Sequence, residues 1–197
     1  MRNAMDQTKR SEAPTVRYLT ANDRSKFTVR AFATGLLSAL GHSPTIAIPE
    51  FQGEALVNPN AIEKSSLRVL IQAASLVVTD DLGEKDREEI HRRMCEEVLE
   101  CDSYPEIVYE CTVASASKAG EGQYWVALSG ELSLHGVRRS LPVSARVRLE
   151  GDTLRAAGEF SVRLSDYEIK PVSAAGGTIK LKDDLKLSFD ITARKPS

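Results

Sequence analysis

The sequence is poor in cysteine and has no long apolar run. Its 197 residues include three cysteines, Cys95, Cys101 and Cys111. An odd number without paired spacing fits thiols that are kept reduced in the cytoplasm, so we expect no disulfide and a cytoplasmic location. No segment reaches the roughly 18 consecutive apolar residues that a membrane-spanning helix needs. A transmembrane segment is therefore not expected.

The sequence also lacks an excess of positive charge and a secretory signal. The 26 Lys and Arg residues are balanced by 28 Asp and Glu residues, giving a net charge of -2 at pH 7. This balance argues against binding to the phosphate backbone of nucleic acids. Residues 1–15 include Arg2 and Lys9 but no apolar segment of the kind that signal peptides carry. We expect residues 1–15 to form a disordered leader and residues 16–197 to form one domain.

Most of the chain alternates between apolar and polar residues, which is the pattern of a strand with one buried face. The apolar positions are Phe27, Val29, Ala31 and Ala33; Ile46, Ile48 and Phe51; Leu67, Val69, Ile71 and Ala73; Ile107, Tyr109, Cys111 and Val113; Tyr124, Val126, Leu128, Leu132 and Leu134; Leu141, Val143, Ala145, Val147 and Leu149; Leu154, Ala156, Gly158, Phe160 and Val162; and Leu185, Leu187, Phe189 and Ile191. Pro49 indicates an edge, a bulge or a bend. The last strand is expected to begin as early as Ile179. About eight strands with short connections favour an up-and-down barrel or a sandwich.

One segment has the period of a helix instead. Between Glu84 and Leu99 the apolar residues Ile90, Met94 and Val98 recur every four positions, so they share one face of an amphipathic surface helix. We expect Asp80 or Asp81 to cap its start. The turn before residue 105, a proline, is expected to end it.

Small residues are mixed with large ones on the inward faces of these strands. They are Ala31, Ala33, Ala73, Gly130, Ala145, Ala156 and Gly158. Such mixing leaves internal space, and a barrel of about eight strands is just wide enough to hold one small ligand. We therefore predict an all-β fold with one inserted helix, in which about eight antiparallel strands form a barrel around a ligand cavity. A well-packed dry core is the alternative.

The resemblance to a known family lies in a strand-turn-strand segment. Residues 130–143, GELSLHGVRRSLPV, resemble the signature of YceI-like proteins. The segments SKFTV at 25–29, FQG at 51–53 and YPEI at 104–107 occur in the matching order and spacing. The resemblance covers residues 18–193 and implies a lipocalin-like barrel that sequesters a polyisoprenoid, an isoprenoid quinone or a similar lipid. Residues 35–44 and 85–99 depart from the commoner pattern and resemble a divergent branch.

The inward register names the residues that we predict to contact such a lipid. They are Phe27, Val29, Leu67, Val69, Ile71, Tyr109, Val126, Leu128, Val143, Val147, Phe160, Leu187 and Phe189, together with the loop residue His42. Burying one methylene contributes about 0.8 kcal/mol, so a hydrocarbon in a tunnel binds with few polar contacts. The expected function is non-enzymatic binding, storage or transport of an elongated apolar ligand, with no catalytic residues and no cofactor other than the lipid.

A few polar residues leave other functions open. His42 or His135 could act as an acid or base on a ligand in the cavity, although each also suits a loop or turn. His91 and Cys95 share a helix face, but a buried thiol explains the cysteine better, so no metal site is expected. Residues 166–170 are expected to form a solvated loop. A solid structural or interaction module is the last alternative, and a homodimer is left open as a partner.

Overall fold

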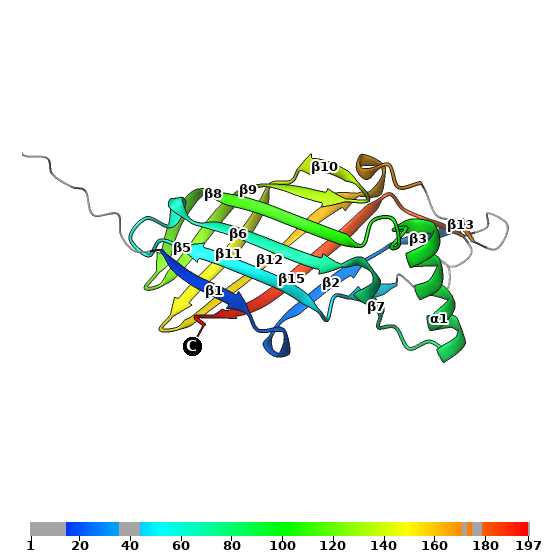
Figure 1. Ribbon diagram of the computed structural model, residues 1–197, viewed down its shortest axis with the longest axis horizontal. Coiled ribbons are helices and arrows are strands. Elements are labelled where there is room, and N and C mark those ends of the chain that lie inside the picture. The colour runs from blue at the N-terminus through cyan, green and yellow to red at the C-terminus, as the bar shows by residue number, and fades with distance from the viewer. Residues whose placement is uncertain (1–14, 36–43, 171–172, 175–178, 197) are drawn as a thin grey trace, which may run out of the picture.

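Eight antiparallel strands close into a barrel (Figure 1). The computed structural model describes residues 15–35, 44–170, 173–174 and 179–196. In spatial order the barrel strands are β1 (Val16–Thr20), β5 (Phe51–Val57), β6 (Ser66–Gln72), β8 (Glu106–Gly120), β9 (Gln123–Leu134), β11 (Val143–Glu150), β12 (Thr153–Arg163) and β15 (Asp184–Arg194). The last of these pairs back with the first. The predicted all-β barrel with one helix is thereby confirmed, while the disordered leader remains a prediction because residues 1–14 lie outside the described part.

Shorter strands extend the wall at one end of the barrel. β2 (Lys26–Arg30) pairs with β15 and continues the sheet through β4 (Thr45–Ala47) to β7 (Val77–Val78), whereas β10 (Val137–Ser140) pairs with β9. β3 (Ala33–Gly35), β13 (Ser173–Ala174) and β14 (Ile179–Leu181) form a separate small sheet. Figure 1 shows β3, β7 and β13 at the same end as the helix, away from the C-terminus.

The helix α1 (Glu84–Arg93) lies beside β7 and continues as a π-helical turn, Met94–Val98. Its first turn is acidic and its last turn is basic, which complements the helix dipole. The helix therefore occupies the predicted segment, but its predicted cap is wrong. Gly83 occupies the N-cap position, and the carboxylate of Asp80 instead accepts a hydrogen bond of 2.8 Å from the backbone N–H of Thr45.

Two strand boundaries also differ from the prediction. Pro49 does not lie within a strand but separates β4 from β5, because a proline cannot donate a hydrogen bond to a sheet. The last strand begins at Asp184, not at Ile179. Residues Ile179–Leu181 form β14 instead, which pairs with β3 in the separate small sheet. Between β14 and β15 the carboxylate of Asp183 accepts a hydrogen bond of 2.7 Å from the backbone N–H of Ser165.

The segment predicted to be a solvated loop is partly buried. Its start belongs to a short 3-10 helix, Leu164–Tyr167. Tyr167 and Ile169 are each 3% exposed and belong to the barrel core. Only the polar residues between and beside them face solvent. The polar composition of this segment therefore led to the prediction of a solvated loop, although Tyr167 and Ile169 are buried.

The buried apolar residues form two clusters along the barrel. One includes Met94 and Leu99 at the end next to α1, and the other includes Ile62, Leu154 and Ala193. β8 alone has 15 residues, so at a rise of about 3.3 Å per residue it is about 50 Å long. The barrel is therefore tall enough for an extended interior. Among the described residues, no helix is long and apolar enough to cross a bilayer.

Candidate functional site

The barrel encloses a cavity of about 930 Å³. This volume lies near the upper end of the range of roughly 300–1,000 Å³ that is usual for ligand pockets. Its wall includes Met94 and Leu99 at the end next to α1, and Ile62 and Ala193 from the second buried cluster. One cavity therefore connects the regions of both clusters, and the barrel interior is hollow.

The apolar wall contains thirteen of the fourteen residues that the inward register predicted as ligand contacts. They are Phe27, Val29, Leu67, Val69, Ile71, Tyr109, Val126, Leu128, Val143, Val147, Phe160, Leu187 and Phe189. Eleven of them come from the barrel strands β6, β8, β9, β11, β12 and β15, whose alternate residues point inward. Phe27 and Val29 come from β2, which pairs with β15 and extends the wall. His42 lies outside the described residues. That these side chains bind a ligand remains a prediction.

Aromatic rings cover one side of the cavity. Phe27 and Phe189 lie edge to face with centroids 6.3 Å apart, and Phe160 lies 6.2 Å from Phe189. Phe51 packs at right angles to Phe27 with a centroid distance of 5.9 Å. Edge-to-face pairs of this kind add a favourable contribution beyond the area they bury. The rings therefore hold one another in place while three of them, those other than Phe51, line the cavity.

Two titratable groups in the wall remain uncharged near neutral pH. The Tyr109 hydroxyl donates a hydrogen bond of 2.9 Å to the carbonyl oxygen of Leu141, and burial raises the pKa of Tyr109 above its ordinary value. Burial likewise raises the pKa of the Cys111 thiol to about 11. Because low polarity disfavours the charged form of both groups, this stretch of wall carries no charge that would repel an apolar chain.

Charged side chains reach the cavity at α1. Within the described part of the chain, the charged residues in its wall are Asp86, Glu89 and Arg93. Asp86 and Glu89 are also exposed to solvent, so the cavity opens beside this helix. We call these three residues the rim. The sequence pattern did not identify them as wall residues, although their spacing places them beside the apolar helix face that includes Ile90.

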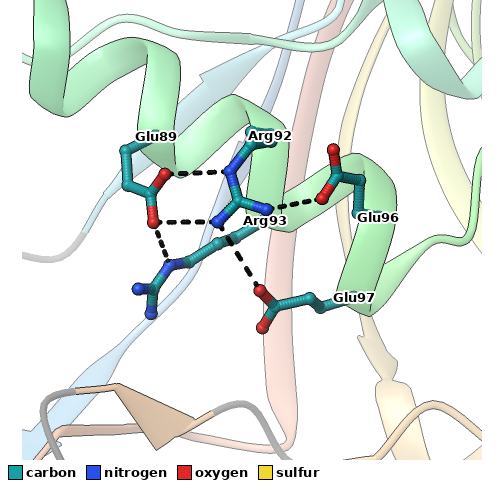
Figure 2. Close-up of polar contacts among 5 residues, drawn as sticks. All are labelled: Glu89, Arg92, Arg93, Glu96 and Glu97. Atoms are coloured by element: carbon teal, nitrogen blue, oxygen red, sulfur yellow. Dashed lines mark hydrogen bonds and ion pairs between the residues drawn. The ribbon is translucent and has the colours of Figure 1, made fainter.

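Glu89 organises the charged side chains of the helix (Figure 2). Its carboxylate accepts hydrogen bonds from Arg92 at 2.9 and 3.0 Å and from Arg93 at 2.6 Å. These two guanidinium groups lower the pKa of Glu89 to about 2, so it is ionised throughout the physiological range. All three residues lie on α1 at separations of three and four residues, the spacing at which helical side chains meet.

The other polar candidates lie away from the cavity wall. His135 occupies a turn with a φ of 51°, its ring lies 4.4 Å from that of Tyr104, and its Nε2 lies 3.3 Å from Glu100 Oε1. His91 Nε2 is 3.2 Å from the carbonyl oxygen of Ala74. Neither imidazole lines the cavity, so the hypothesis of an enzyme loses His135 as its acid or base. The cysteines are free thiols, and the described residues contain no group of three or more metal-ligating side chains.

Comparison with known proteins finds one family model and several solved structures that are similar to this chain. Residues 18–193 match the family model of the YceI-like domain. No curated protein matches the sequence. A polyisoprenoid binding domain from Saccharophagus degradans, implicated in plant cell wall breakdown, has a TM-score of 0.66 at 14% identity, with 92% of this chain and 99% of that chain covered.

Two further structures have the same fold. BcnA of Burkholderia cenocepacia has a TM-score of 0.64 at 17% identity, with 88% of this chain and 98% of that chain covered. The YceI protein of Campylobacter jejuni has a TM-score of 0.56 at 14% identity, with 77% and 85% covered. At these identities the likeness shows the fold alone.

Proposed function

This chain belongs to the YceI-like family, and from that premise we propose that its barrel binds an elongated apolar lipid. A polyisoprenoid or an isoprenoid quinone has the required shape. The protein stores or transports this lipid and makes no covalent bond to it.

The observation that carries the proposal is the long, apolar cavity. It connects the regions of the two buried clusters, and its only charged wall residues among those described are the three rim residues at α1. Each methylene that leaves water for such a wall contributes about 0.8 kcal/mol, so a hydrocarbon tail gains affinity in proportion to its length. A tail bound along the cavity needs no polar contacts except at its head group.

The fold comparison supports the same ligand class. The Saccharophagus degradans domain, which shares the fold over almost its whole length, is a polyisoprenoid binding domain. The alternatives are less well supported. A solid interaction module does not account for a cavity of about 930 Å³, and His135 lies outside the cavity wall.

Extraction of the purified protein tests the proposal. We expect an organic extract analysed by mass spectrometry to contain an isoprenoid lipid in near-stoichiometric amount, and native mass spectrometry to show the matching mass increase. Delipidated protein should then bind a polyprenol added in detergent. A protein that copurifies with no lipid and has no affinity for polyprenols would contradict the proposal.

We also propose a cytoplasmic location, because the three free cysteines fit a reducing compartment. Cell fractionation with a compartment marker tests this part separately. Recovery of the protein from an oxidising compartment would contradict it.

A further inference from the structure

We propose that the rim selects lipids whose head group is an uncharged hydrogen-bond acceptor, such as a carbonyl or a hydroxyl, and disfavours a phosphate head group. The inference rests on the proposed function and specifies the class of lipid. Its basis is the arrangement of charges where the cavity meets solvent, since a head group that remains in water while the tail is buried lies at the same place.

The three rim residues lie on one side of α1, next to the cavity. Asp86, Glu89 and Arg93 lie at intervals of three and four residues on α1, so they form one ridge along the helix. Each of them lines the cavity, as do Ile90 and Met94 beside them. The ridge therefore borders the apolar interior directly.

Glu89 holds the guanidinium of Arg93 in one orientation. Its Nε donates a hydrogen bond of 2.6 Å to Glu89 Oε1, which fixes the guanidinium at one edge (Figure 2). Within the described residues, its two terminal nitrogens have no hydrogen-bond acceptor. A guanidinium carries five N–H donors, so Arg93 retains donors for a carbonyl, hydroxyl or ether oxygen at the cavity opening.

The charges around the Arg93 guanidinium sum to a negative value. In the cluster of Figure 2, three carboxylates face two guanidinium groups, which leaves one net negative charge. The rim residue Asp86 adds a second. Because Glu89 already neutralises Arg93, a phosphate would approach a negative field without a full positive charge to receive it. An uncharged acceptor gains the hydrogen bond from Arg93 and meets no such repulsion.

The test compares three ligands with the same isoprenoid chain length: a polyprenol, its monophosphate and the hydrocarbon without a head group. Displacement of a fluorescent lipid probe gives the affinity of each. We expect the polyprenol to bind about 10-fold more tightly than the monophosphate at low ionic strength, and the gap to narrow as salt screens the rim charges. We expect the hydrocarbon to bind about 5-fold more weakly than the polyprenol, a ratio within the range of one net hydrogen bond.

Two variants separate the role of Arg93 from the helix charge in general. Arg93→Met removes every side-chain N–H donor at this position, so it should lower polyprenol affinity to that of the hydrocarbon and leave the hydrocarbon unchanged. Arg87→Met makes the same change on the same helix at a residue that does not line the cavity, so the preference should persist. Glu89→Gln should raise monophosphate affinity about 10-fold, because it removes a negative charge and releases Arg93. Circular dichroism checks that each variant retains its helix.

Two results would contradict the inference alone, and a third would contradict the proposed function as well. A native protein that binds the monophosphate as tightly as the polyprenol contradicts the inference while the proposed function stands. The same holds if Arg93→Met weakens all three ligands equally. If none of the three ligands binds, the proposed function fails, and the inference fails with it.

Discussion

A phenylalanine introduced at Ala156 should shorten the usable cavity by about one isoprene unit. Ala156 lines the cavity in the region of the second buried cluster, where it pairs with Val147 and Ile191 across the neighbouring strands. Its neighbour Ala157 does not line the cavity. Ala156→Phe and Ala157→Phe are therefore the same change at adjacent positions on opposite faces of β12, and the second variant serves as a matched control.

The magnitude follows from the number of tail carbons that lose their place. The added ring has about six carbons and displaces roughly the five carbons of one isoprene unit from the end of the cavity. At about 0.8 kcal/mol per methylene, a tail that fills the native cavity loses about 4 kcal/mol, which is roughly a thousandfold in affinity. A tail that is already one unit shorter does not reach the ring and should keep its affinity.

A series of polyprenols that differ by one isoprene unit measures this effect. We expect affinity to rise with chain length up to a maximum, and this maximum to occur one unit earlier in Ala156→Phe than in the native protein or in Ala157→Phe. Thermal unfolding checks that both variants are folded. The reasoning is refuted if Ala156→Phe weakens short and long chains by the same factor, or if the two variants behave alike.

Three further predictions concern stability and the cavity wall. Gly130→Ala should lower the free energy of unfolding by about 1–3 kcal/mol in chemical denaturation, because the added methyl would lie 2.5 Å from Tyr109 Oη and 2.6 Å from Cys111 Cβ; an unchanged denaturation midpoint would contradict this. Alkylation of Cys111 by iodoacetamide should be slow at pH 8 and should become about tenfold faster per pH unit toward its pKa of about 11, because the thiolate is the reactive form. Bound polyprenol should slow this reaction. Equal rates with and without polyprenol would show that the thiol lies outside the ligand path. Folding raises the pKa of Cys111 from 9.0 to about 11, so the neutral thiol's contribution to stability is complete below pH 9 and is lost as pH rises toward 11. Over that window the free energy of unfolding of Cys111→Ala should therefore fall by roughly 2–3 kcal/mol less than that of the native protein. Parallel plots of this free energy against pH for the two proteins would argue against the prediction.

The barrel wall could be predicted from the sequence because its signal is local. Successive side chains of a strand point to opposite faces, so Val143, Ala145 and Val147 identify the inner face of β11 without any knowledge of its neighbours. The same holds for Leu187 and Phe189 in β15. Alternation alone did not separate a barrel from a sandwich, and the small inward residues and the family resemblance favoured the barrel. The pairing order of the strands depends on which distant segments meet, and it was not predicted.

The features that prediction missed depend on contacts between distant segments. Asp80 is a good cap by composition, but in the fold its carboxylate is bound to the backbone of Thr45, 35 residues away. Tyr167 lies within a polar segment and is nevertheless buried in the core. The rim was missed for a related reason: on an amphipathic helix a charged residue such as Arg93 reads as solvent-facing until the position of the cavity opening is known.

At two positions in the barrel wall a glycine lies next to the aromatic ring of a residue on a neighbouring strand. A methyl group at Gly158 would lie 2.8 Å from the ring of Phe189, its partner on β15, and a methyl group at Gly130 would contact the ring of Tyr109. Both rings therefore lie against the wall in space that glycine alone leaves free. A larger residue at either position would meet these rings, and at Gly158 it would also lie 2.6 Å from the carbonyl oxygen of Ser144. Small and large inward residues thus lie beside each other on neighbouring strands, and this arrangement helps to keep the interior hollow.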